Sequence, residues 1–114
     1  MNRRLLLLAL LTVPLVALAH HGWSEYDVAR PLKLAGTIES LSYEHPHASV
    51  KLKTADKTWL AVLAPPTRME ARGVPKEMLV AGTTVTVEGY RSKTNPDEMR
   101  SERITIADKT TDLR

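Results

Sequence analysis

The stretch TWLAVLAPPTRMEARG, residues 58–73, decides the fold that the sequence predicts. Residues 58–64 are apolar on both faces, which is typical of a strand that is covered on both sides. Two prolines end this strand, and Thr67 and Glu70 then stand at the spacing of a capping box at the start of a short helix. Gly73 follows, and glycine commonly ends helices. The stretch therefore predicts a covered strand that leads directly into one short helix.

Alternating apolar and polar residues predict two strands before this stretch and two after it. The apolar phase of the first strand changes after Gly36, which indicates a bulge or a sharp bend. The four strands are expected near residues 32–43, 48–53, 84–88 and 103–106.

The order of three strands, one short helix and two strands matches an OB-like, five-stranded small barrel, all-β apart from that helix. Another small antiparallel barrel fits the same order. The sequence contains no repeat and no sign of a second domain. It divides into a signal peptide (residues 1–19), an N-terminal arm (20–31), an OB-like barrel domain (32–107) and a polar tail expected to fray (108–114).

The first 19 residues have the three parts of an export signal. Arg3 and Arg4 form a positive start, residues 5–18 are apolar, and Ala17-Leu18-Ala19 offers a small-x-small cleavage site. The apolar segment is shorter than the roughly 20 residues of a membrane span, and an uncleaved anchor is the alternative. We expect cleavage before His20, a periplasmic or secreted protein, and no stable membrane span after cleavage.

Composition limits both the partners and the means of stabilisation. Loss of Arg3 and Arg4 with the signal would leave 14 basic against 13 acidic residues, a net charge of +1. That balance lacks the basic footprint of a nucleic-acid-binding protein, so no nucleic-acid partner is expected. The chain has no cysteine, so its stability must come from the apolar core rather than from disulfides.

Four histidines are the candidate metal ligands: His20, His21, His45 and His47. Cleavage before His20 would place an α-amino group beside its imidazole, and these two nitrogens form a bidentate chelate. Nitrogen ligands of this kind favour copper, with nickel and zinc as alternatives. A third nitrogen, from His47 or His45, would complete an arrangement that resembles the histidine brace of copper proteins. His21 would supply an additional or transferring ligand.

Several other residues have plain structural interpretations. Trp23 is expected to pack the arm onto the barrel, and Trp59 to lie in the core. Arg91, Lys93 and Arg100 are expected to form a solvated loop. The sequence offers no nucleophile in a recognisable catalytic pattern and little room for a deep cleft, so the protein is not expected to be an enzyme.

The whole mature chain resembles a family of small exported bacterial proteins of unknown function. The resemblance rests on HHGWSEYD (residues 20–27), the Pro46-His47 pair, ARGVPKEML (71–79) and AGTTVTVEGYRSK (81–93). Family members usually begin His-His-Ser-aromatic and carry Asn-Pro-His, so Gly22 and His45 depart from the pattern. The resemblance implies the OB-like fold and the exported compartment, but no activity.

Together these observations predict a periplasmic protein that binds or delivers a transition metal, most readily copper, through its mature N-terminus and its His-Pro-His turn. The alternative is an OB-like adaptor whose groove binds an envelope protein or a small ligand, with exposed histidines that have no specific metal role. An oxidative copper enzyme is a third interpretation, although open coordination alone does not make a substrate site.

Overall fold

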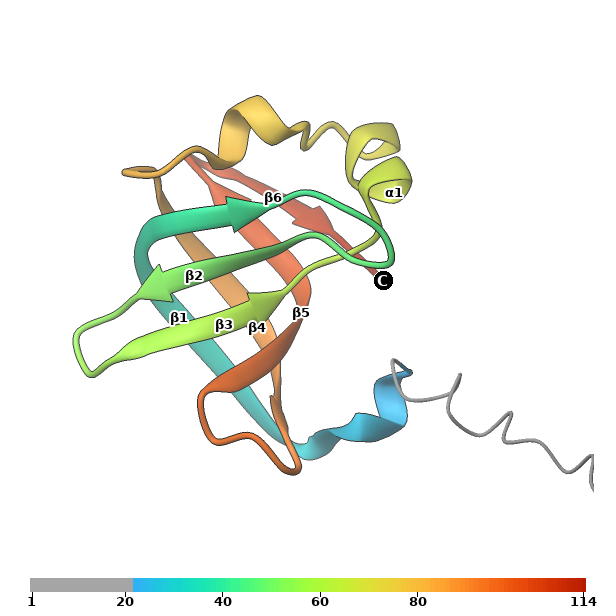
Figure 1. The fold of residues 1–114 in the computed structure, drawn as a ribbon, viewed down its shortest axis with the longest axis vertical. Helices are drawn as coiled ribbons and strands as arrows, with labels where there is room; N and C mark the ends of the chain where they lie inside the picture. Colours follow the sequence, from blue (N-terminus) through green and yellow to red (C-terminus); the bar gives the residue numbers. More distant parts are fainter. Residues whose placement is uncertain (1–21) are drawn as a thin grey trace, which may run out of the picture.

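The structure is a computed structural model that describes residues 22–114. These residues form one sheet of six strands, in the order β3-β2-β1-β4-β5-β6, and one α-helix (Figure 1). In chain order, the elements are the 3-10 turn η3 (Trp23–Glu25), β1 (Tyr26–Ser42), β2 (Ser49–Lys53), β3 (Thr58–Val62), α1 (Pro66–Ala71), the 3-10 turn η4 (Lys76–Leu79), β4 (Thr84–Ser92), β5 (Glu98–Ile106) and β6 (Lys109–Asp112).

Five of the strands close into a ring. β3 pairs with β5 in parallel, from Leu60 opposite Glu98 to Val62 opposite Arg100. The other pairings in the ring, β1 with β2, β2 with β3, β1 with β4 and β4 with β5, are antiparallel. The helix α1 lies between β3 and β4 in the chain. This connectivity is that of the OB fold, so the predicted all-β, OB-like barrel is confirmed.

β1 is long enough to pair with two neighbours. Residues 37–42 pair with β2, and residues 26–37 pair with β4. The strand therefore starts at Tyr26, earlier than the barrel start predicted at residue 32, because pairing with β4 draws most of the predicted arm into the sheet. Of the arm expected at residues 20–31, the described part before the sheet is residues 22–25.

The bend predicted in the first strand is present near Gly36. The register of β1 against β2 shifts between Ile38 and Ser40. A Cβ at position 36 would overlap the carbonyl oxygen of Lys53 on β2, so a glycine lets the two backbones approach closely there.

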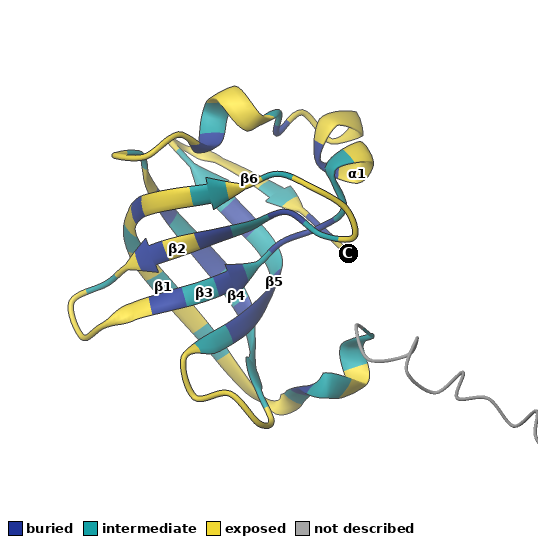
Figure 2. Ribbon diagram, viewed as in Figure 1, coloured by how far each residue is buried: buried dark blue, intermediate teal, exposed yellow. Residues whose placement is uncertain are grey.

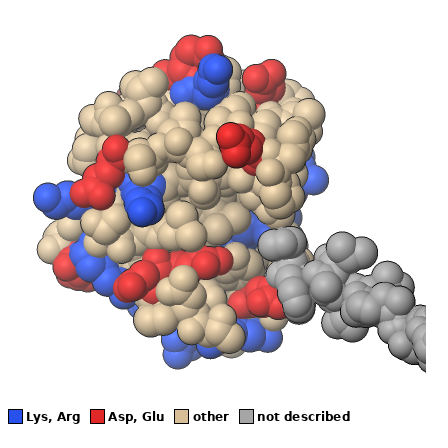
Figure 3. Space-filling model, in the orientation of Figure 1, with Lys and Arg blue, Asp and Glu red and all other residues tan. Residues whose placement is uncertain are grey.

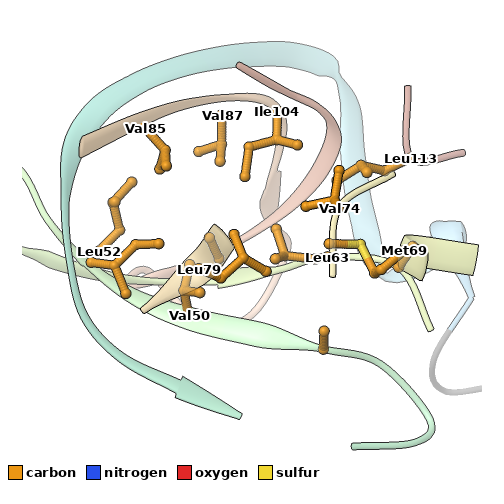
Figure 4. Packing of buried hydrophobic residues seen from close by; sticks show 14 of the residues in the cluster. Val50, Leu52, Leu63, Met69, Val74, Leu79, Val85, Val87, Ile104 and Leu113 are labelled. Carbon is orange, nitrogen blue, oxygen red and sulfur yellow. The ribbon is translucent and has the colours of Figure 1, made fainter. Parts of the chain in front are cut away.

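The apolar core lies inside the barrel. In the close-up of Figure 4, Val85 and Val87 from β4 point toward Val50 and Leu52 from β2. Buried and more exposed residues alternate along these strands, as the banded colours of Figure 2 show. Trp59 on β3 is buried as predicted.

The helix α1 ends as predicted but does not begin as predicted. Its N-cap residue is Pro65, and no side chain caps it, so the capping box predicted from Thr67 and Glu70 is wrong. A proline in the first turn provides the helical φ angle without needing an amide partner. At the other end, Gly73 has a φ of 86° and donates to the Glu70 carbonyl at 3.0 Å. The next amide donates to the Met69 carbonyl at 2.8 Å, which completes a Schellman motif.

The C-terminal segment is ordered, which corrects the predicted frayed tail at residues 108–114. β6 pairs with β5 after a tight turn, and the side chain of Leu113 is only 1 % exposed. Arg68 of α1 donates to the Leu113 carbonyl at 3.3 Å, and Arg72 donates to the Asp112 carbonyl at 2.7 Å. The segment carries a single large apolar side chain, and one apolar residue gives no alternating pattern from which a strand could be predicted.

No helix within residues 22–114 is long and apolar enough to cross a membrane.

Candidate functional site

His47 is held at the end of the turn that joins β1 to β2. The next residue, Ala48, is fully buried and exchanges two backbone hydrogen bonds with the chain after β3, to Ala64 at 2.9 Å and from Leu63 at 2.8 Å. These bonds fix the backbone beside His47, whose side chain is half-buried. Its Nε2 lies 3.3 Å from Nη2 of Arg100 on β5.

Arg100 is buried, with only 4 % of its surface exposed, so its expected place in a solvated loop is wrong. The reason is a bulge at Glu102, where the β4–β5 register shifts between Glu88 and Gly89. Near this bulge, three successive residues, 99–101, are buried. A Cβ on Gly89 would overlap the Arg100 carbonyl oxygen, so the glycine allows the close approach. Burial lowers the pKa of the Arg100 guanidinium from its ordinary value.

The ring of Trp23, in the turn η3 before β1, lies against this guanidinium. The Cζ atoms of Arg100 and Arg114 each lie 4.4 Å from the centroid of the Trp23 ring, a distance typical of cation–π contacts. Tyr90 of β4 packs edge-on against the same ring, with centroids 6.2 Å apart. The prediction that Trp23 packs the arm onto the barrel is therefore confirmed.

Tyr26 fixes the start of β1 beside Trp23. Its hydroxyl donates to Oε2 of Glu98 at 2.6 Å, and burial together with this carboxylate raises its pKa above the ordinary value. The amide of Lys93 also donates to the Glu25 carbonyl at 3.0 Å. The chain from residue 23 to residue 26 is thus bound to the β4–β5 end of the barrel.

The structure brings only part of the predicted histidine set into this arrangement. His47 contacts Arg100, which in turn contacts Trp23. His45 and Glu44 of the same turn are exposed, and the His45–Pro46 peptide bond is cis. His20 and His21 lie outside the described residues. Within residues 22–114, no three His, Cys, Asp or Glu side chains are grouped so that they could hold a metal ion.

A second feature lies beside β2, β3 and the loop between β4 and β5. A hollow of about 240 Å³ is lined by Lys51, Thr58, Trp59, Leu60, Asn95 and Asp97. The Nζ of Lys57 lies 4.4 Å from the centroid of the Trp59 ring and also pairs with Asp97 at 2.9 Å. In the orientation of Figure 1, the surface carries charged groups of both signs with uncharged atoms between them (Figure 3).

Sequence reasoning missed Arg100 as a site residue. Its partner His47 is 53 positions away in the chain, and no local pattern links two such residues. The available signal was the glycine at position 89 within an otherwise regular strand, since such a glycine often marks a close backbone approach.

The family model of DUF6152, a family of unknown function, matches residues 8–99. This chain belongs to that family. No curated protein matches this chain. Like the sequence resemblance described above, membership of DUF6152 carries no statement of activity.

Solved structures similar to this DUF6152 protein are similar in fold alone. They include a ZRD-deleted mutant of TiaS in complex with agmatine, at 21 % identity and a TM-score of 0.54, over 72 % of this chain and 22 % of that one. A complex of TiaS with a tRNA and ATP gives 21 % identity and a TM-score of 0.54, over 73 % and 19 %. The S. pombe Stn1–Ten1 complex gives 11 % identity and a TM-score of 0.55, over 68 % and 57 %. The chain therefore spans about a fifth of the TiaS chains and just over half of the Stn1–Ten1 chain.

Proposed function

We propose that this DUF6152 protein is exported and binds copper(II) in the periplasm, to buffer or deliver the ion. The ligands are the α-amino group and imidazole of His20, at the mature N-terminus, and the imidazole of His47. The role is binding rather than catalysis.

The observation that carries this proposal is the shared contact of His47 and Trp23 with one guanidinium. Trp23 follows His20 by three positions, and three residues of extended chain span about 10 Å. A reach of that length, starting from a tryptophan that contacts the same guanidinium as His47, keeps the N-terminal chelate within range of the imidazole. His45 is exposed in the same turn and serves at most as an accessory ligand, as does His21.

The donor set fits copper best. One amine and two imidazoles are nitrogen ligands, for which copper(II) has the highest affinity among the first-row divalent ions. Nickel and zinc are the alternatives at the same site. Because amine and imidazole ligands must lose protons before they bind, the affinity for copper should fall as the pH drops.

The two histidines of the turn provide a matched pair for the test. Calorimetric titration of the mature protein with copper(II) should give one tight site. His47→Ala should weaken it by about tenfold or more, because the loss of even a group that supports a metal ligand typically costs that much. His45→Ala, two positions away and exposed, should change the affinity much less. Electron paramagnetic resonance should show nitrogen coupling from His47. Equal, weak binding by both variants would contradict the proposal.

The hollow on β2 and β3 favours a second candidate function, the binding of a small ligand or an envelope protein. OB folds commonly bind their ligands on this face and in the adjoining loops. A nuclear magnetic resonance screen with small-molecule fragments tests it: shifts should cluster at the amides of Lys51, Leu60 and Asp97, which line the hollow. Shifts scattered over the barrel, or none, would contradict this second candidate.

A further inference from the structure

The indole nitrogen of Trp59 is a donor for which the described part of the chain, residues 22–114, supplies no acceptor. Only 3 % of Trp59 is exposed, and the nitrogen itself is shielded from water. A buried donor without an acceptor costs free energy, so such a group in a folded protein calls for an explanation. Trp59 also lines the hollow of about 240 Å³ beside β2 and β3, and a ligand held in that hollow can supply the acceptor.

Two long cationic side chains cover the ring of Trp59. Nζ of Lys57 lies 4.4 Å from the ring centroid, and Cζ of Arg91 lies 5.4 Å from it. The side chain of Lys57 is 38 % exposed, so it can shift without disturbing the core. A ligand that reaches the indole therefore has to move one of these side chains, and it meets positive charge there.

The charges around the hollow favour an anion. Among the described residues that line it, Asp97 is the one carboxylate, and its Oδ1 already pairs with Nζ of Lys57 at 2.9 Å. Lys51 in the lining and Arg91 beside Trp59 have no carboxylate partner anywhere in residues 22–114. A negatively charged ligand would balance these two cations, whereas a positively charged one would be repelled by them.

The size and the apolar part of the lining favour a small molecule. Leu60 is half-buried in β3, and Thr58 lies on the same side of that strand. A volume of about 240 Å³ is at the small end of ligand sites, while a partner protein needs a much larger surface.

We propose that this hollow binds a small organic carboxylate. One carboxylate oxygen accepts the indole N–H of Trp59 after Lys57 moves off the ring, the other pairs with Lys51, and the apolar body of the ligand lies against Leu60. The inference rests on the second candidate function, the binding of a small ligand in the hollow, and is independent of copper. It assigns the charge and the size of that ligand.

Three probes of one shape and different charge test the assignment. Benzoate is an anion, benzamide is neutral and benzamidinium is a cation. In nitrogen-15 spectra of the mature protein at constant ionic strength, benzoate should shift the amides of Lys51, Leu60 and Asp97. It should also move the indole N–H signal of Trp59 downfield, as the formation of a hydrogen bond does. Benzamide should bind about threefold or more weakly, because it lacks the charge, and benzamidinium more weakly still.

The outcomes separate this inference from the candidate function on which it rests. If benzamide or benzamidinium shifts the same amides as strongly as benzoate, the inference is wrong and the hollow remains a ligand site. An indole signal that stays in place while benzoate saturates the amides also overturns the inference. Shifts from none of the three probes overturn it too, and the second candidate function falls only if the wider fragment screen finds nothing at these amides.

Two lysines of β2 provide a matched pair of variants. Lys51 and Lys53 are both exposed on the same face of the strand, and of the two, Lys51 lines the hollow. Lys51→Met should weaken benzoate binding by about two- to fivefold, the worth of an exposed charge pair. Lys53→Met should weaken it much less, because salt screens a more distant exposed charge. Equal weakening would mean diffuse attraction to a basic surface and would overturn the proposal. Neither side chain is in the core, and thermal melts by circular dichroism should confirm that both variants fold.

Discussion

At the scale of single residues, the end of the barrel near Trp23 is organised by side chains that hold one another in place. Arg100 lies between His47 and the ring of Trp23, and Tyr26 beside them binds Glu98 at 2.6 Å. Each of these contacts joins a residue of β5 either to the turn between β1 and β2 or to the N-terminal arm. Contacts between these side chains therefore join the N-terminal arm to the turn between β1 and β2, the two segments that contain the four histidines.

Tyr26 gives a prediction for alkaline pH. Burial and Glu98 raise its pKa in the folded protein, while in the unfolded chain it ionises near its ordinary value of about 10. The contribution of Tyr26 to stability is therefore complete below that value and is lost as the pH rises above it. Thermal melts between about pH 9 and about pH 11 should show a smaller loss of stability for Tyr26→Phe than for the native protein.

At neutral pH, Tyr26→Phe should cost about 1.5–3 kcal/mol, the worth of a hydrogen bond to a charged group such as the Glu98 carboxylate. Identical pH profiles for the two proteins would mean that the tyrosine is not buried against Glu98 as the structure has it.

At the scale of elements, the sequence predicts the barrel well and its C-terminal end poorly. Three strands, one helix and two strands follow from periodicity, prolines and glycines, because each of those signals is local. β6 was not predicted, since its residues, 109–112, are polar or exposed and the anchor Leu113 stands alone. The start of β1 was missed because its pairing with β4 is a contact between distant segments. For the same reason the sequence predicts a loop position for Arg100, which the structure places in β5.

The docked C-terminal segment gives a second prediction. Leu113→Ala should lower the free energy of unfolding by about 2–5 kcal/mol, the usual cost of removing a large buried side chain. Lys109→Ala on the exposed side of β6 is the matched control and should stay within about 0.5 kcal/mol. Urea denaturation measures both, and equal, small effects would show that the segment frays after all.

At the scale of the whole molecule, the barrel is a scaffold that presents one end to the N-terminal arm. The core of Figure 4 uses no histidine, so we expect the protein to fold without metal and to show a cooperative melt of a β-rich protein by circular dichroism. Charges of both signs are mixed over the face in Figure 3, and the predicted mature chain has a net charge of +1. In this account, copper binds at the end of the barrel where Trp23 of the arm and His47 both contact Arg100.

The most direct test of the copper proposal changes the N-terminus and nothing else. Three alanines added before His20 keep every imidazole but move the α-amino group away from the His20 ring, so the chelate of amine and imidazole on one residue is lost. An extension of this length also leaves no histidine at the second or third position of the chain, where an imidazole and the terminal amine form a different copper chelate.

Calorimetric titration should show one copper(II) ion bound tightly by the protein that starts at His20. Binding by the extended protein should be at least about tenfold weaker, because the loss of even a group that supports a metal ligand typically costs that much. Equal affinity of the two proteins would contradict the account, because the N-terminal chelate would then have no part in binding copper.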